Sequence, residues 1–92
     1  MKIKIKLLRP FSDAVGKKEI EYDFKGRNIS DLINFLVKEY PKLENEFYTK
    51  EKVLSDYMCI FVNDKPISAL RGLDTELKND NEILFFMPVS GG

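Results

Sequence analysis

Two glycines end the sequence, and their position suits them to one kind of chemistry. Gly91 and Gly92 carry no side chains, so they can enter a channel too narrow for other residues and adopt backbone angles that other residues avoid. The α-carboxylate of Gly92 would sit on a flexible tether beyond the folded body. It is inert at neutral pH, but transfer of AMP to it by an enzyme gives an acyl-adenylate that nucleophiles attack.

A frayed chain end is the alternative interpretation of this pair, because termini are commonly disordered. The glycines follow directly on the most apolar strand that the sequence predicts, through Met87–Ser90. This position favours a reactive tail over residues 90–92, with Ser90 and Gly91 threading into a partner and Gly92 reacting. Residues 1–89 would form the single folded domain.

The rest of the composition offers little for catalysis by the chain alone. There is no histidine and one cysteine. A zinc site of nitrogen and sulfur ligands is therefore nearly excluded, and we predict no metal site. Histidine-based general base catalysis and Ser-His or Cys-His nucleophiles are excluded outright. These absences favour a chain that serves an enzyme over one that is catalytic alone.

The charge balance and the hydropathy of the chain limit which partners it can bind and which cellular compartment it fits. Fifteen basic and fifteen acidic residues cancel, so the chain has no general electrostatic attraction to nucleic acid or to an anionic membrane. The charged residues that alternate with apolar ones at the N-terminus interrupt any signal peptide, and no apolar run is long enough to span a bilayer. A single cysteine cannot form an internal disulfide, which fits a reducing cytoplasm.

The first half of the chain predicts a hairpin and a helix. Residues 2–8 and 18–24 alternate with period two, with lysines outward on the first strand and acids outward on the second. The Pro- and Gly-containing segment 9–16 predicts a loop between them. Apolar residues at helical spacing predict a helix over residues 29–40, with Ser30 as N-cap and Pro41 ending it. Residues 42–56 predict a short helical turn and a surface loop.

The second half predicts two apolar strands and a short edge strand. Residues 57–62 and 82–89 are apolar on both faces, which is typical of strands that are central or lie under a partner. Residues 65–68 contain a proline and predict a short edge strand, and residues 70–78 predict a loop with one helical turn. The order of elements predicts a two-layer α+β domain.

One helix cannot cover both faces of the two apolar strands. We assign Met58, Ile60, Val62, Ile83, Phe85 and Met87 mainly to the core. The opposite face then exposes apolar side chains, and exposed apolar patches usually mark interaction sites. We predict a partner-binding surface of Phe86, Leu84, Phe61, Leu8 and Pro88, with Phe86 foremost because it lies nearest the tail. The alternative is ordinary packing under residues 43–54. Cys59 is interpreted as a small hydrophobe of its strand.

The C-terminal segment carries a family resemblance. Residues 79–92 read NDNEILFFMPVSGG and resemble the small, sulfur-carrying subunit of molybdopterin synthase, whose members end in an acidic turn, an apolar strand and P-P-V-small-G-G. Residues 61–64 resemble the family's V-N-x turn, and Lys4–Phe11 with Asp13 and Gly16 resembles its opening. Two residues depart from the family pattern: Met87 stands where the first proline is typical, and Asn81 stands where an acid is common. The resemblance implies a ubiquitin-like β-grasp: a mixed sheet of about five strands covered on one face by a helix.

The resemblance also implies a reaction cycle and its partners. A ubiquitin-activating-like adenylyltransferase would use ATP and Mg²⁺ to adenylate Gly92, and a sulfur donor would convert the adenylate to a thiocarboxylate. The large subunit of molybdopterin synthase would then receive the tail, in a heterotetramer, and pass the sulfur to a pyranopterin precursor for molybdenum or tungsten. The chain itself would bind no cofactor.

Other functions share the first step and stay open at this point. A ubiquitin-like modifier would join Gly92 to lysines of other proteins. Related carriers serve thiamine synthesis or tRNA thiolation. A plain β-grasp interaction module with an inert tail is the third class.

Overall fold

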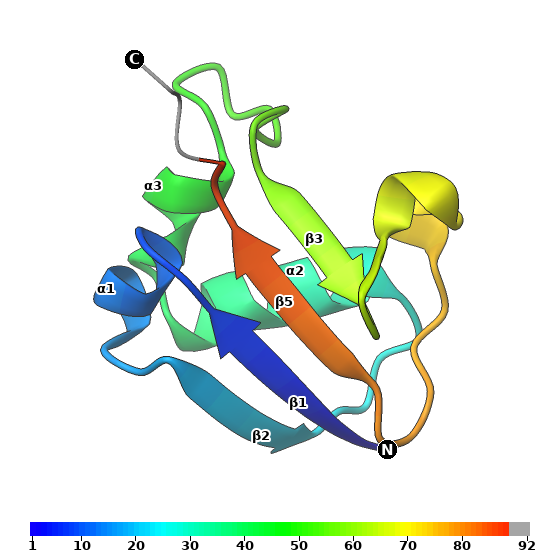
Figure 1. The fold of residues 1–92 in the computed structure, drawn as a ribbon. Coiled ribbons are helices and arrows are strands. Elements are labelled where there is room, and N and C mark those ends of the chain that lie inside the picture. Colours follow the sequence, from blue (N-terminus) through cyan, green and yellow to red (C-terminus); the bar gives the residue numbers. More distant parts are fainter. Residues whose placement is uncertain (89–92) are drawn as a thin grey trace.

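A mixed five-stranded sheet with helices on one side forms the protein (Figure 1). The computed structural model describes residues 1–88. The predicted tail residues Ser90, Gly91 and Gly92 lie outside the described residues, and so does the predicted boundary between domain and tail.

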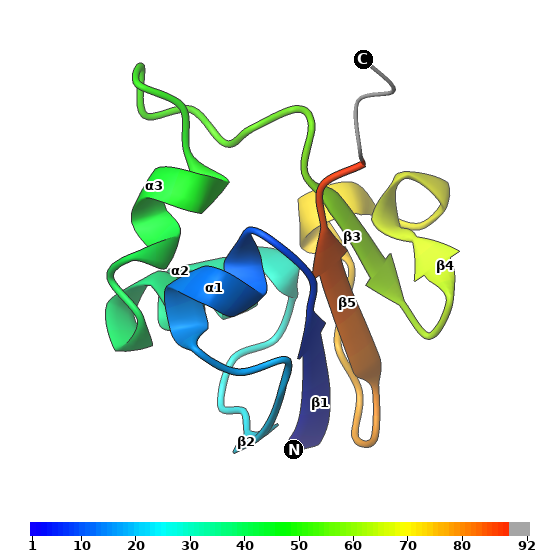
Figure 2. The same cartoon turned by 60° about the vertical axis from the view of Figure 1, so that its left-hand side comes forward.

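The sheet has the strand order β2-β1-β5-β3-β4. Its central pair, β1 and β5, is parallel, and the other pairs are antiparallel. Figure 2 shows the helices on one side of the sheet. The strands are β1 (Lys2–Leu7), β2 (Glu19–Asp23), β3 (Cys59–Val62), β4 (Lys65–Pro66) and β5 (Glu82–Phe86); the α-helices are α1 (Phe11–Val15), α2 (Ile29–Glu39) and α3 (Leu43–Phe47); two 3-10 turns, η1 and η2, span Ile67–Ala69 and Gly72–Asp74. The predicted α+β, ubiquitin-like β-grasp architecture is confirmed.

The first hairpin follows from its alternating sequence. Ile3, Ile5 and Leu7 are buried beneath the helices, while the lysines between them face the open side. The antiparallel register places Lys4 opposite Glu21 and brings each of the other lysines opposite an acid of β2. The predicted complementary cross-strand pairs are therefore confirmed in register, and each stabilises the sheet modestly.

Helix α2 begins two residues earlier than its predicted cap implies. The N-cap is Asn28, whose side-chain oxygen accepts a hydrogen bond from the Asp31 backbone N–H at 2.9 Å. The prediction of Ser30 as N-cap was wrong because asparagine, equally good at capping, lies two residues earlier in the extended conformation that a cap requires. Pro41 follows the helix end as predicted.

The predicted loop over residues 9–16 contains a helix. Helix α1 begins after Pro10 and ends at Gly16, whose positive φ of 82° terminates it in the left-handed conformation favoured by glycine. Local composition misled the prediction because tertiary packing decides this segment: Phe11 is fully buried and fixes the turn of helix to the core. Within residues 1–88, no helix has the length and apolarity needed to cross a membrane.

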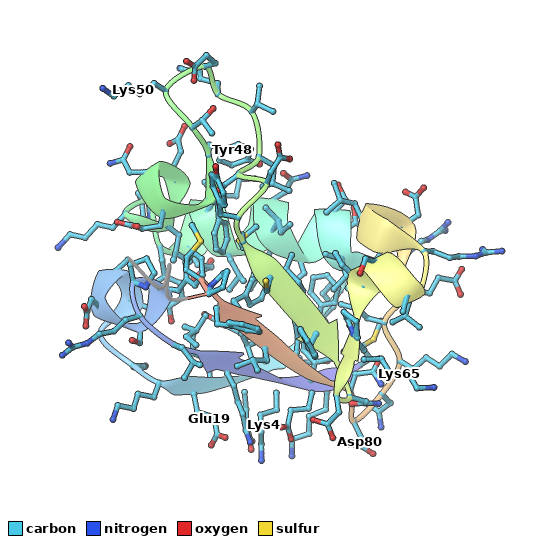
Figure 3. The ribbon with its side chains drawn as sticks, turned by 45° about the horizontal axis from the view of Figure 1, so that its top comes forward. Lys4, Glu19, Tyr48, Lys50, Lys65 and Asp80 are labelled. Atoms are coloured by element: carbon cyan, nitrogen blue, oxygen red, sulfur yellow. The ribbon has the colours of Figure 1, made fainter. Side chains whose placement is uncertain are left out.

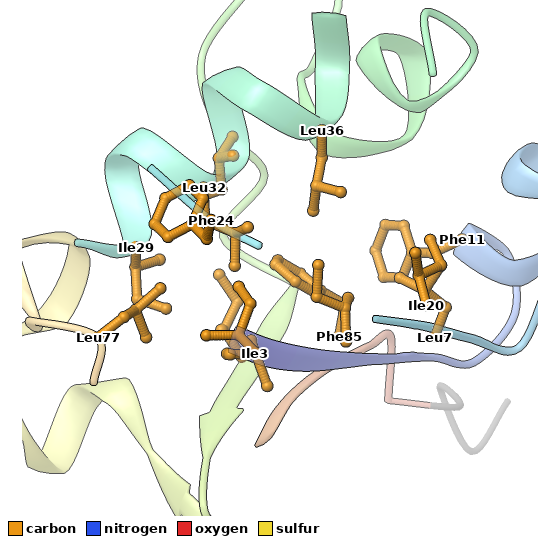
Figure 4. Close-up of a cluster of buried hydrophobic side chains, with 14 of the residues drawn as sticks. Ile3, Leu7, Phe11, Ile20, Phe24, Ile29, Leu32, Leu36, Leu77 and Phe85 are labelled. Atoms are coloured by element: carbon orange, nitrogen blue, oxygen red, sulfur yellow. The ribbon is translucent and has the colours of Figure 1, made fainter. Parts of the chain in front are cut away.

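Three phenylalanines join the short helices to the sheet. Phe11 of α1, Phe47 of α3 and Phe85 of β5 lie with ring centroids 5.2 to 6.4 Å apart, and Figure 4 shows Phe11 and Phe85 within the buried cluster. The predicted helical turn after residue 42 is confirmed, but Leu43 and Phe47 are core residues rather than parts of a surface loop. This aromatic cluster fixes which way β5 presents its side chains.

Both apolar strands are shorter than predicted. β3 begins at Cys59 rather than residue 57, and β5 ends at Phe86 rather than residue 89. The ladder that joins them ends at the pair Cys59 and Phe86, so Met58 and Met87 lie just outside the strands. The short edge strand β4 is confirmed over Lys65–Pro66, whereas the other two residues predicted for it, 67 and 68, belong to the turn η1. The predicted helical turn in residues 70–78 is confirmed as η2.

Candidate functional site

Alternation along β5 divides its side chains between the core and the open face of the sheet. Ile83 and Phe85 are fully buried against the helices, whereas Leu84 and Phe86 face the other side and are half-buried. β3 divides in the same way, with Ile60 and Val62 inside. The predicted core is confirmed for these strand residues. Met58 and Met87 are half-buried and pack against it from outside the strands.

The outward side chains of the two strands form a continuous apolar patch. The antiparallel register places Phe61 directly opposite Leu84 and Cys59 opposite Phe86, and the rings of Phe61 and Phe86 lie diagonally with centroids 5.5 Å apart. We call Cys59, Phe61, Leu84 and Phe86 the apolar patch. The prediction that Phe61, Leu84 and Phe86 share the open face is confirmed, and Leu43 and Phe47, from the segment that the alternative placed over the patch, are buried in the core.

Leu8 and Pro88 continue the patch toward the tail. The Leu8 backbone N–H donates to the Phe85 carbonyl at 3.1 Å, which holds Leu8 at the end of the sheet where β1 and β5 both finish. The side chain of Leu8 is 52% exposed, although the residue lies just after β1 and not within a strand as predicted. Pro88, two residues after Phe86, is exposed and leads into the tail. We call the end of the sheet where β1 and β5 finish the tail end of the sheet.

The other half of the open face is ionic. Lys4 and Glu19 point away from α2 on that side (Figure 3). At its border with the patch, the Lys6 ammonium lies 2.9 Å from the Glu82 carboxylate. Hydrogen bonding and the charge of Lys6 lower the pKa of Glu82, and the same hydrogen bond raises the pKa of Lys6. Charge on this half is thus matched within the chain.

A loop projects at the tail end of the sheet, as predicted for residues 42–56, but it also includes Tyr57, which the sequence had assigned to a strand. Tyr57 is 77% exposed and Val53 is 60% exposed, in an ordered loop whose base is closed by hydrogen bonds from Thr49 to Val53 and from Ser55 to Phe47. Figures 1 and 2 show this loop rising at the same end of the sheet as the end of β5. Hydropathy alone assigned Tyr57 to a buried strand. No local sequence signal distinguishes a tyrosine in that strand from one in an exposed loop just before it.

The described residues contain no arrangement typical of metal chemistry. Among residues 1–88, no three acidic or cysteine side chains gather closely enough to hold a metal ion. Cys59 is a free, half-buried thiol within β3. The predicted reacting group, the Gly92 carboxylate, and the threading residues Ser90 and Gly91 lie outside the described part of the chain.

Comparison with known proteins assigns the chain to a family. The ThiS family matches residues 5–92. The chain belongs to the ThiS family. A protein of Archaeoglobus fulgidus that is named as a sulfur carrier is 28% identical over 92 residues, covering 100% of both chains.

Solved structures place this ThiS-family protein among ubiquitin-like folds with different names. The small archaeal modifier protein 1 of Methanosarcina acetivorans is 31% identical, with a TM-score of 0.85 over 99% of this chain and 96% of that one. A Pyrococcus furiosus protein named as subunit 1 of a molybdopterin converting factor is 26% identical, with a TM-score of 0.74 over 97% and 99% of the two chains. The ThiS-family chain is therefore of the sulfur-carrier and ubiquitin-like type, and its relatives divide among pathways.

Proposed function

We propose that this protein is a sulfur carrier of molybdenum or tungsten cofactor biosynthesis. The observation that carries the proposal is the apolar patch beside the start of the tail: Phe86 lies on the open face two residues before Pro88, from which the chain runs toward Gly92. A partner that covers this patch would receive the tail directly. Aromatic side chains are enriched at the centres of such interfaces.

The reacting group in this proposal is the α-carboxylate of Gly92. It attacks the α-phosphorus of ATP, held with Mg²⁺ by a ubiquitin-activating-like adenylyltransferase, and pyrophosphate leaves. Hydrosulfide, released from a sulfur donor, then attacks the acyl carbon and displaces AMP, leaving a thiocarboxylate and a proton. No residue of the chain catalyses either step; its folded part contributes docking.

The second partner is the large subunit of molybdopterin synthase, in a heterotetramer. The chain's relatives support a partner-binding carrier, since one is named as a subunit of a molybdopterin converting factor. The same apolar patch serves both partners in turn, so they bind one at a time. The lysines and arginines that act on the pyranopterin precursor belong to the large subunit.

Reconstitution tests this assignment. The thiocarboxylate form of the chain is mixed with the cognate large subunit and the cyclic precursor, and dithiolene formation is followed by conversion of the product to a fluorescent derivative. We expect product with the thiocarboxylate and none with the carboxylate form. A thiocarboxylate that yields no product with a competent large subunit contradicts the assignment to this pathway.

A ubiquitin-like modifier is the second candidate, and one observation favours it. The 31% identity to small archaeal modifier protein 1 exceeds the 26% identity to the molybdopterin converting factor subunit. Adenylation of Gly92 is common to both functions, and the acceptor differs. Diglycine remnants on lysines of other cellular proteins, found by peptide mass spectrometry and lost on deletion of Gly92, would support the modifier. If the chain instead carries sulfur for thiamine synthesis or tRNA thiolation, deletion of Gly92 should abolish the corresponding product.

A further inference from the structure

A hollow with a basic rim opens at the tail end of the sheet, beside the apolar patch. It has a volume of about 660 Å³ and lies between the end of β1, helix α1 and the turn that follows α1. Leu8 lines it and is also the outermost residue of the predicted docking surface. The hollow is therefore continuous with the surface on which the proposed partners dock.

Backbone hydrogen bonds build the walls of this hollow. The Gly16 N–H donates to the Ser12 carbonyl at 2.7 Å and closes α1, and the Leu7 N–H donates to the Lys18 carbonyl at 2.8 Å. The second bond ties the turn of Lys17 and Lys18 to the end of β1. The two lysines thus hold fixed backbone positions on the rim although their side chains are exposed.

Charge on the rim is unbalanced in a chain whose total charge is zero. The lining residues include Arg9, Lys17 and Lys18 against a single acid, Asp13. That acid lies 3.6 Å from Arg9. Among residues 1–88, neither Lys17 nor Lys18 takes part in an ion pair. On the ionic half of the open face, the register places each lysine of β1 opposite an acid of β2, and the Lys6 ammonium lies 2.9 Å from the Glu82 carboxylate.

We propose that this hollow binds an acidic segment of the proposed activating enzyme, with an apolar side chain of that segment against Leu8 and its carboxylates against Lys17 and Lys18. This inference rests on the proposed docking function. Charge complementarity and continuity with the patch select this occupant. Because exposed ion pairs add little affinity, the lysines act mainly by steering association, which raises on-rates and falls with ionic strength.

The first test needs no cognate partner. The isotope-labelled chain is titrated with a short peptide of alternating glutamate and leucine, and amide shifts are followed by NMR. We expect shifts at Leu8, Gly16, Lys17 and Lys18 that weaken with added salt. In K17E/K18E the peptide should bind about tenfold more weakly. The matched control K38E/K78E makes the same change in net charge at exposed lysines outside the hollow and should leave binding unchanged.

Three outcomes overturn the proposal. Equal shifts with a glutamine-leucine peptide would show that the carboxylates are irrelevant. Shifts of the same amides with AMP alone would assign the hollow to phosphate. An equal loss in K38E/K78E would show a non-specific charge effect.

A second test uses the proposed activating enzyme. The kcat/KM for adenylation should fall about tenfold in K17E/K18E at low ionic strength, and the wild-type dependence on salt should flatten. An unchanged kcat/KM overturns the inference while the proposed function stands. Failure of the wild-type chain to be adenylated contradicts the proposed function, and the peptide titration still decides what the hollow binds.

Discussion

The two halves of the open sheet face differ in how far the chain satisfies them by itself. On β1 and β2, Lys4 lies opposite Glu21, and the border pair Lys6 and Glu82 is 2.9 Å apart. On β3 and β5, Phe61 lies opposite Leu84, and its ring centroid is 5.5 Å from that of Phe86. Within residues 1–88, each lysine of β1 lies opposite an acid of β2, whereas Phe61, Leu84 and Phe86 stay half-buried on the open face. This difference is the reason for proposing the apolar half as the docking surface.

Two adjacent phenylalanines of β5 allow the buried face and the open face of the sheet to be compared directly. Phe85 is fully buried in the aromatic cluster and Phe86 is on the open face. Phe85→Ala should lower the free energy of unfolding by about 3–5 kcal/mol, because it leaves a cavity. Phe86→Ala should cost about 1 kcal/mol. Urea denaturation of both variants measures this, and equal losses would mean that both rings serve the core.

Charge placed on the apolar patch should break docking and spare the fold. Phe86→Asp should lower kcat/KM for adenylation on the order of a hundredfold, the effect of losing a central aromatic contact. Lys4→Met is the matched control, since it makes the same change in net charge on the ionic half. It should stay within about twofold of wild type. A comparable loss in both variants would show that the two halves are equivalent.

Coupling between the patch rings is a smaller effect. The centroids of Phe61 and Phe86 are 5.5 Å apart, so a double-mutant cycle with alanine should give a coupling of about 0.5–1.5 kcal/mol in unfolding free energy. The same cycle on the binding free energy of the activating enzyme should also be non-additive. Strict additivity in both would mean that the two rings act independently.

The pair of Lys6 and Glu82, at the border of the two halves, should give the smallest effect, which is a change in the pKa of Glu82. The pKa of Glu82 lies below its ordinary value of 4.5 because of Lys6. A carboxyl pKa depressed by folding stabilises the protein above the unfolded-state value and loses that contribution as pH falls through the folded-state value. Lys6→Met should return the pKa to near its ordinary value, as measured by carboxyl-carbon NMR. An unchanged pKa would place its cause elsewhere.

Periodicity predicted most of this fold because burial and alternation coincide in the strands. It assigned Ile83 and Phe85 inward and Leu84 and Phe86 outward, as found. It failed where tertiary packing overrides composition: Phe11 draws a Pro- and Gly-flanked segment into a helix, and Phe47 is buried.

The exposed end of the sheet was harder to predict. Tyr57 continues an apolar run in sequence but lies beyond the last strand pair, a limit that hydropathy does not encode. The basic hollow escaped prediction because it needs helix α1, which the sequence did not predict, beside the turn of Lys17 and Lys18. The role of the terminal glycines, in contrast, stays a prediction from residue type and position.

Intact mass spectrometry tests the central claim, that the Gly92 carboxylate is the reacting group. The chain is incubated with its cognate activating enzyme, ATP, Mg²⁺ and a sulfur donor. We predict a mass increase equal to the exchange of one oxygen for sulfur, located at the C-terminal residue by fragmentation and absent when Gly92 is deleted. An unchanged mass with an enzyme that adenylates the chain, or sulfur located at Cys59, would contradict the claim.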